Sequence, residues 1–116
     1  MMKNYRERIL ATRLKITEVS VPEWGDDPLY VRGLTGADFA HVKTKTSKLT
    51  TEAAEIVSAI WIALLSLCDA DGRRVMQDDD YQSFAEQPIA VLTRVTEAAI
   101  AVSGMGAAGV DSAKKD

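Results

Sequence analysis

The apolar run from Ile56 to Cys68 constrains the fold of this chain more than any other segment. Only Ser58 and Ser66 are polar within it. A helix on the surface of a domain shows one apolar stripe, whereas this run is apolar on almost every side. We therefore predict a helix over about residues 51–68 that is either central in the domain or in contact with another chain. The run is too short to span a bilayer, and we expect no membrane segment.

Two short strands are predicted before this helix. Residues 14–21 alternate between apolar and polar, and residues 29–34 are rich in β-branched and aromatic side chains, as half-buried strands are. Turn-forming residues around Trp24 join the two strands into a β-hairpin. Because an isolated hairpin is marginally stable in water, this one must pack against the helices.

Further helices are predicted on both sides of the apolar one. Thr35 is a good N-cap for a helix over about residues 36–48. Three consecutive aspartates, residues 78–80, favour the start of a short helix, and Pro88 fits the first position of a final amphipathic helix that ends near Gly104. The predicted fold class is therefore α+β and mainly α, with an N-terminal β-hairpin packed on a bundle of about four helices.

The length of 116 residues suits one domain. We assign this domain to residues 1–104. Residues 105–116 are rich in Gly, Ala, Ser and charge, and we expect them to form a flexible, disordered C-terminal tail. The first residues carry positive charges with no apolar segment behind them, so we expect no secretory signal and a cytoplasmic location.

No pattern for catalysis or cofactor binding stands out in the sequence. Cys68, the single cysteine, lies in the apolar run, where the exposure that a nucleophile needs is not expected. His41, the single histidine, has no cysteine or histidine near it in sequence with which to bind zinc. The formal charge of −3, with basic residues spread thinly, argues against nucleic-acid binding. We therefore predict that the protein is not an enzyme, needs no cofactor or metal, and acts by binding other proteins.

The binding surface is expected around the hairpin and the apolar helix. The candidate residues for a partner or self-association surface are Trp24, Tyr30, Arg32, Ile60, Trp61 and Leu64. Three alternatives stay open: Trp24 folds back over the helices, Trp61 is a core residue, and Arg32 pairs with an acid. Because the apolar surface exceeds what so few elements readily cover, we expect a homo-oligomer formed through the helix at 51–68, the final helix, or both.

Six segments follow one another in an informative order. They are Val21-Pro22-Glu23-Trp24-Gly25, residues 29–39, Leu65-Ser66-Leu67-Cys68-Asp69, Asp71-Gly72-Arg73-Arg74-Val75-Met76, a helix with an acidic cap that carries Tyr81 and Phe84, and a closing amphipathic helix that ends in Val102-Ser103-Gly104. Over about residues 10–104 this order resembles the tail assembly chaperones of long-tailed bacteriophages. No single motif is specific to that family, so the order of the segments carries the resemblance.

The resemblance implies a phage-encoded chaperone that binds the tape-measure protein, keeps it soluble and helps recruit tail-tube subunits. Such a chaperone acts in the host cytoplasm and leaves before the tail is complete, so it is not expected in the mature virion. Members of the family often have a longer form made by ribosomal frameshifting, and Ala113-Lys114-Lys115 is compatible with a slippery A-rich stretch of codons. The alternative is a structural tail or head–tail joining subunit of a phage or prophage.

Overall fold

The computed structural model describes residues 4–104 and shows an α+β protein that is mainly helical. Its helices are α1 (Tyr5–Leu10), α2 (Gly36–Thr46), α3 (Thr51–Ser66), α4 (Tyr81–Phe84) and α5 (Ile89–Val102), with short 3-10 helices η1 (Pro22–Trp24) and η2 (Asp78–Asp80). Its strands are β1 (Ile16–Val19), β2 (Leu29–Arg32) and β3 (Leu67–Cys68). The predicted fold class is confirmed, while the predicted tail, residues 105–116, lies outside the described residues.

The predicted β-hairpin is present and forms most of a three-stranded antiparallel sheet of order β1-β2-β3. In β1 and β2, Val19 is opposite Leu29 and Ile16 is opposite Arg32. The third strand was not predicted. It pairs with β2 so that Leu67 lies opposite Val31, which ties the end of α3 directly to the hairpin.

The helix predicted to reach residue 68 ends two residues earlier, because Leu67 and Cys68 pair with β2 instead. The Ser66 hydroxyl donates a hydrogen bond of 2.7 Å to the carbonyl of Ile62, and the main-chain amide of Leu67 still bonds to the carbonyl of Ala63. Leu67 then adopts extended dihedral angles, with φ −61° and ψ 128°. The last two apolar residues of the run therefore become β3 instead of a final helical turn.

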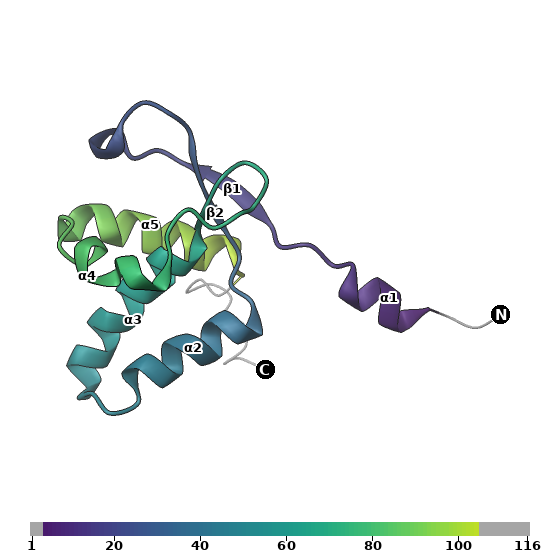
Figure 1. Ribbon diagram of the computed structural model, residues 1–116, viewed down its shortest axis with the longest axis horizontal. Helices are drawn as coiled ribbons and strands as arrows, with labels where there is room; N and C mark the ends of the chain where they lie inside the picture. Colours follow the sequence, from purple (N-terminus) through teal and green to yellow (C-terminus); the bar gives the residue numbers. More distant parts are fainter. Residues whose placement is uncertain (1–3, 105–116) are drawn as a thin grey trace, which may run out of the picture.

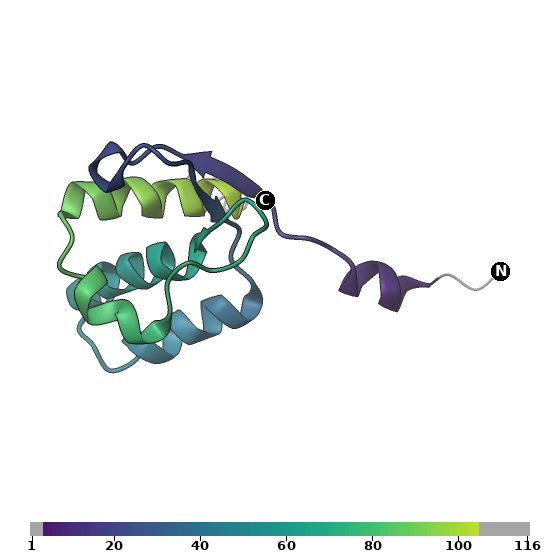
Figure 2. The same cartoon turned by 45° about the horizontal axis from the view of Figure 1, so that its top comes forward.

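The elements are layered around α3. Figure 2 shows the hairpin over α5, with α3 beneath α5 and α2 on the far side of α3; these neighbours are in contact in the same order. The core lies between these layers, and its fully buried side chains include Val31 from the sheet, Leu64 from α3 and Val95 from α5. The helix α3, which is apolar on almost every side, is thus central in the domain. This is one of the two alternatives that the sequence predicted.

The N-terminal arm, defined as residues 4–15, projects from this body (Figure 1). It contains α1 and the segment that joins α1 to β1, and no residue of α1 is buried. Tyr5 and Ile9 are 61% and 68% exposed, although both are large and apolar. The arm accounts for the elongated outline of the molecule, whose principal extents are 54 × 36 × 28 Å.

None of the helices within residues 4–104 has the length and apolar character needed to cross a membrane.

Candidate partner-binding surface

The six residues chosen from the sequence do not form one surface. Ile60, Trp61 and Leu64 are all buried in the core of a single chain, which corrects their assignment to a partner surface. The reason is that α2, α4 and α5 of the same chain cover most of the circumference of α3. Self-association through these three side chains would require the domain to open.

Trp61 is held between other side chains of its own domain. Its indole stacks on the Tyr81 ring, with centroids 4.6 Å apart and an interplanar angle of 18°. The His41 ring meets it edge-on with centroids 5.0 Å apart, and Lys45 Nζ lies 5.3 Å from the centre of the indole. Of the two sequence-based alternatives for Trp61, the core is the one observed.

Arg32 and Tyr30 are half-buried on β2. The guanidinium of Arg32 lies 3.8 Å from the carboxylate of Asp38 and donates a 3.4 Å hydrogen bond to the carbonyl of Gly72. Asp38 is therefore the acid in the alternative that Arg32 forms an ion pair, which the sequence had left open. Tyr30 lies opposite Cys68 in the β2–β3 ladder. Both residues therefore contribute to the join between the hairpin and the helices.

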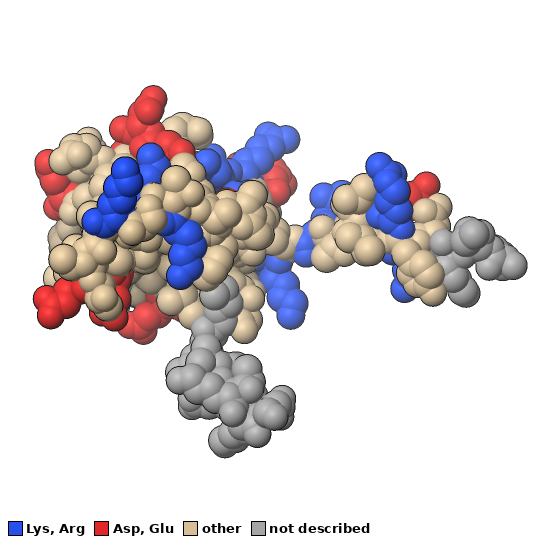
Figure 3. Space-filling model, turned by 90° about the horizontal axis from the view of Figure 1, so that it is seen from below, with Lys and Arg blue, Asp and Glu red and all other residues tan. Residues whose placement is uncertain are grey.

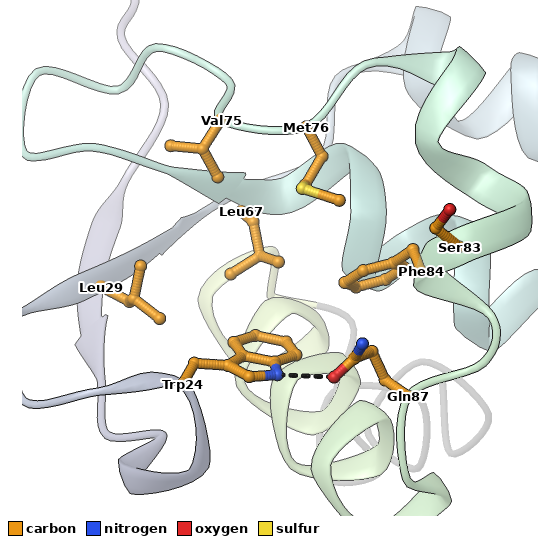
Figure 4. A pocket seen from close by; sticks show the side chains of 8 residues that line it. All are labelled: Trp24, Leu29, Leu67, Val75, Met76, Ser83, Phe84 and Gln87. Atoms are coloured by element: carbon orange, nitrogen blue, oxygen red, sulfur yellow. Dashed lines mark hydrogen bonds between the residues drawn. The ribbon is translucent and has the colours of Figure 1, made fainter.

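Trp24 folds back over the body and forms one wall of a cavity. Its indole N–H donates a 2.8 Å hydrogen bond to Oε1 of Gln87, and its ring lies 6.0 Å from that of Phe84 at an angle of 46°. The cavity, which we call the hairpin pocket, has a volume of about 330 Å³. Figure 4 shows the residues that line it: Trp24, Leu29, Leu67, Val75, Met76, Ser83, Phe84 and Gln87.

The hairpin pocket is apolar inside, and the two segments that supply most of its lining are acidic. Six of its eight lining residues are apolar. The two segments that supply most of the lining, residues 24–29 and 75–87, contain six acidic residues and no Lys or Arg: Asp26, Asp27, Asp78, Asp79, Asp80 and Glu86. Such a pocket favours an apolar side chain with positive charge beside it.

Two of these acids have hydrogen-bond partners within the chain, and Asp80 accepts a bond of 2.7 Å from the main-chain amide of Gln77. Asp78 accepts a 3.0 Å hydrogen bond from Arg74, which lowers the pKa of its carboxyl group. The Oδ2 of Asp78 also lies 3.1 Å from Nε2 of His41, although the two atoms are not aligned as a hydrogen bond. Asp26, Asp27, Asp79 and Glu86 are exposed, so the segments that line the pocket carry exposed negative charge.

A second apolar surface lies where α3 and α5 meet. Ile56 and Ile89 are 57% and 69% exposed, and they border a shallow cavity of about 230 Å³ that Ala59, Ile60 and Leu92 also line. We call this surface the α3–α5 patch. It lies on the two helices from which self-association was expected, but its exposed residues are not those chosen from the sequence.

The reactive side chains are not arranged around either surface. Cys68 is fully buried, and this burial raises the pKa of its thiol, so the unreactive protonated form prevails at neutral pH. Within residues 4–104, His, Cys, Asp and Glu side chains form no group of three that could hold a metal ion. Both surfaces are lined mainly by apolar side chains.

A comparison with solved structures decides what this fold is. The chain is similar to the solved structure of the bacteriophage HK97 tail assembly chaperone, with a TM-score of 0.62 over 86% of this chain and 98% of that one. The chain has the fold of the HK97 tail assembly chaperone. The sequences are 16% identical, so the likeness to the HK97 chaperone establishes the fold and transfers no residue roles. No family model and no curated protein matches the sequence.

The fold that the sequence resemblance implied is thus confirmed. The residues that form the two apolar surfaces could be identified only from the structure. The hairpin pocket combines residues from η1, β2, β3 and α4 and from the loops beside them. Among its lining residues, only Trp24 was chosen from the sequence as a candidate for a binding surface. Met76 was the available signal, because its unbranched and polarisable side chain is suited to adaptable binding surfaces. Ile89 is exposed at the first turn of α5, at the edge of the apolar face of this helix.

Proposed function

We propose that this protein is a phage tail assembly chaperone that acts by protein–protein binding in the host cytoplasm. The observation that carries the proposal is the shared fold with the HK97 tail assembly chaperone over nearly the full length of both chains. The order of segments in the sequence, which resembles the same family, supports it independently. Two exposed apolar surfaces on a small domain are consistent with a binding role.

The proposed client is the tape-measure protein, and the proposed second partner is the tail-tube protein. We assign client binding to the α3–α5 patch, because Ile56 and Ile89 stand on adjacent helices and flank a shallow cavity. A groove between two helices suits the apolar face of a helix from another chain. Burying an isoleucine side chain fully stabilises a complex by roughly 1.5–3 kcal/mol, so two exposed isoleucines are a substantial part of a binding site.

A pull-down with the tape-measure protein of the same phage tests the proposal. Wild-type protein is expected to be retained on the immobilised tape-measure protein, and the double variant Ile56→Ser/Ile89→Ser to bind at least about tenfold more weakly. The matched control is Leu49→Ser, which removes an exposed leucine from the loop between α2 and α3. This control is expected to bind like wild type. Absence of wild-type retention would contradict the proposed client.

The mature virion separates a chaperone from a structural tail or head–tail joining subunit. A chaperone that leaves during assembly is expected to be absent from purified virions and present in the lysate. Mass spectrometry of both fractions measures this directly. A fixed number of copies per virion would identify the protein as a structural subunit instead.

A further inference from the structure

The N-terminal arm is an element without enough contacts to be stable by itself. Its helix α1 has six residues and buries none of them, whereas isolated helices shorter than about 12–15 residues are marginal in water. Tyr5 and Ile9 are four positions apart, so they lie on one face of α1 and form an apolar pair there. The side chain of Asn4 accepts only a long cap hydrogen bond of 3.4 Å from the amide of Glu7. Further stability must come from packing against another surface.

The charge of the arm is opposite to that of the body. Residues 4–15 contain four basic side chains, Arg6, Arg8, Arg13 and Lys15, and one acidic side chain, Glu7. Residues 16–104 contain seven basic and fourteen acidic side chains. The arm therefore has a net charge of +3 and the body one of −7. Figure 3 shows basic side chains on the projecting arm, away from the body. The acidic body of a second copy of this chain therefore attracts the basic arm.

The hairpin pocket fits the arm in both chemistry and size. Its interior is apolar, and the two segments that line it carry four exposed acids: Asp26, Asp27, Asp79 and Glu86. In the arm, Arg6 and Arg8 lie between Tyr5 and Ile9 in the sequence, so positive charge stands beside the apolar pair. The volume of about 330 Å³ is within the range of roughly 300–1,000 Å³ that is usual for binding pockets.

We propose that the arm of one copy of this protein docks in the hairpin pocket of a second copy. The apolar pair of α1 enters the pocket, and Arg6 and Arg8 meet exposed acids of the segments that line it. The arm leaves the body at the end of the hairpin where Ile16 faces Arg32 and points outward (Figure 1). The pocket is at the opposite end, beside Leu29 and Trp24, so the arm is directed away from its own pocket and is available to a neighbour.

This exchange defines the kind of assembly that forms. An arm and a pocket are different surfaces, so the contact is heterologous and either closes reciprocally between two copies or continues from copy to copy. The contact does not depend on the proposed function, because it involves neither a client nor the α3–α5 patch. It also differs from association through α3 and α5, which leaves the arm unused.

A mixing experiment tests the exchange. One variant lacks residues 1–13 and keeps the pocket; the other, Val75→Arg, keeps the arm and places a bulky cation in the pocket. Val75 is half-exposed, so its replacement is compatible with folding, which circular dichroism checks. By light scattering, wild type is expected to self-associate, each variant alone to be a monomer, and the 1:1 mixture to form a heterodimer. The association should weaken as salt is raised, because opposite charges contribute to it.

Three outcomes would overturn the proposal. They are a wild-type protein that stays monomeric at high concentration, an arm-deleted protein that associates like wild type, and a mixture that remains monomeric. Cross-linking locates the contact: oxidation of mixed Ile9→Cys and Val75→Cys proteins is expected to give a disulfide-linked dimer faster than a mixture of Ile9→Cys with Ile89→Cys. Equal rates for the two mixtures contradict docking at the pocket. Retention on the tape-measure protein is measured separately with the α3–α5 variants, so a failure here is distinguishable from a failure of the proposed function.

Discussion

Trp24 and Gln87, 63 positions apart in the chain, are joined by a hydrogen bond of 2.8 Å from the indole N–H to the amide oxygen. The bond connects the tip of the hairpin to the residue before Pro88, at the turn between α4 and α5 (Figure 4). It also fixes the indole as one wall of the hairpin pocket. The shape of that pocket therefore depends on one long-range polar contact.

Replacing Gln87 by leucine tests the contribution of this contact. The variant keeps a similar size and leaves the half-buried indole N–H without its acceptor, so we expect a loss of about 1–2 kcal/mol in the free energy of unfolding. Urea denaturation measures the loss. The control is Gln82→Leu on the exposed side of α4, with an expected change within about 0.5 kcal/mol. Equal effects of the two substitutions would show that the hydrogen bond contributes nothing.

The ion pair between Glu23 and Arg94 predicts a dependence of stability on pH. Two hydrogen bonds of 2.8 and 3.1 Å join the side chains. The bonds from Arg94, with a smaller main-chain contribution, lower the pKa of Glu23 from 4.5 to about 2. Because this carboxyl group has a lower pKa in the folded state, its contribution to stability is complete above the unfolded pKa. It is lost as the pH falls from about 4.5 through about 2.

The measurement for this pair is the difference in unfolding free energy between wild type and Glu23→Gln. Both side chains are partly exposed, so the difference at neutral pH should be small and should decrease in high salt. Below the folded pKa the two proteins should be equally stable. A difference that is independent of pH would mean that the charge of Glu23 has no role.

The central position of α3 predicts a sharp contrast between two of its residues. Leu64 is fully buried, whereas Ile56 on the same helix is 57% exposed. Leu64→Ala is expected to lower the unfolding free energy by about 2–5 kcal/mol, because it removes packed atoms and leaves a cavity. Ile56→Ala is expected to change it by less than about 1 kcal/mol in the monomer. Similar losses for both would contradict the position of α3 in the core.

Thr35 predicts a separate effect at the start of α2. Its hydroxyl accepts a 2.9 Å hydrogen bond from the amide of Asp38, and the Asp38 carboxylate accepts one of 3.0 Å from the amide of Thr35. Thr35→Ala is expected to cost about 0.5–2 kcal/mol of stability. Thr93→Ala, at an exposed position within α5, should be neutral or slightly stabilising because alanine favours helices. Thermal unfolding of the two variants gives the comparison.

The sequence predicted the local elements well because their signals are local. The alternation before Trp24, the N-cap at Thr35 and the proline before α5 each depend on neighbouring residues, and the structure has a strand or helix at each place. The strand β3 escaped prediction because it has two residues, at the end of a run that is otherwise helical. Its pairing with β2 depends on a contact far along the chain.

The binding surfaces could not be predicted in the same way. Whether Trp61 is a core or a surface residue depends on where α2 and α4 pack, and no periodicity in α3 contains that information. The hairpin pocket depends on Trp24 turning toward a glutamine from a distant segment. The exposure of α1 could not be predicted either, because the spacing of Tyr5 and Ile9 is that of any short amphipathic helix. Tertiary packing decides each of these cases.

The most direct test of the central claim is the solubility of the tape-measure protein in cells that do or do not co-express this chain. If the chain is a tail assembly chaperone, most of the tape-measure protein should move from the pellet to the soluble fraction when the two are made together. The effect should be lost with Ile56→Ser/Ile89→Ser and kept with Leu49→Ser. A tape-measure protein that stays equally insoluble in the presence of folded wild-type chain would contradict the account.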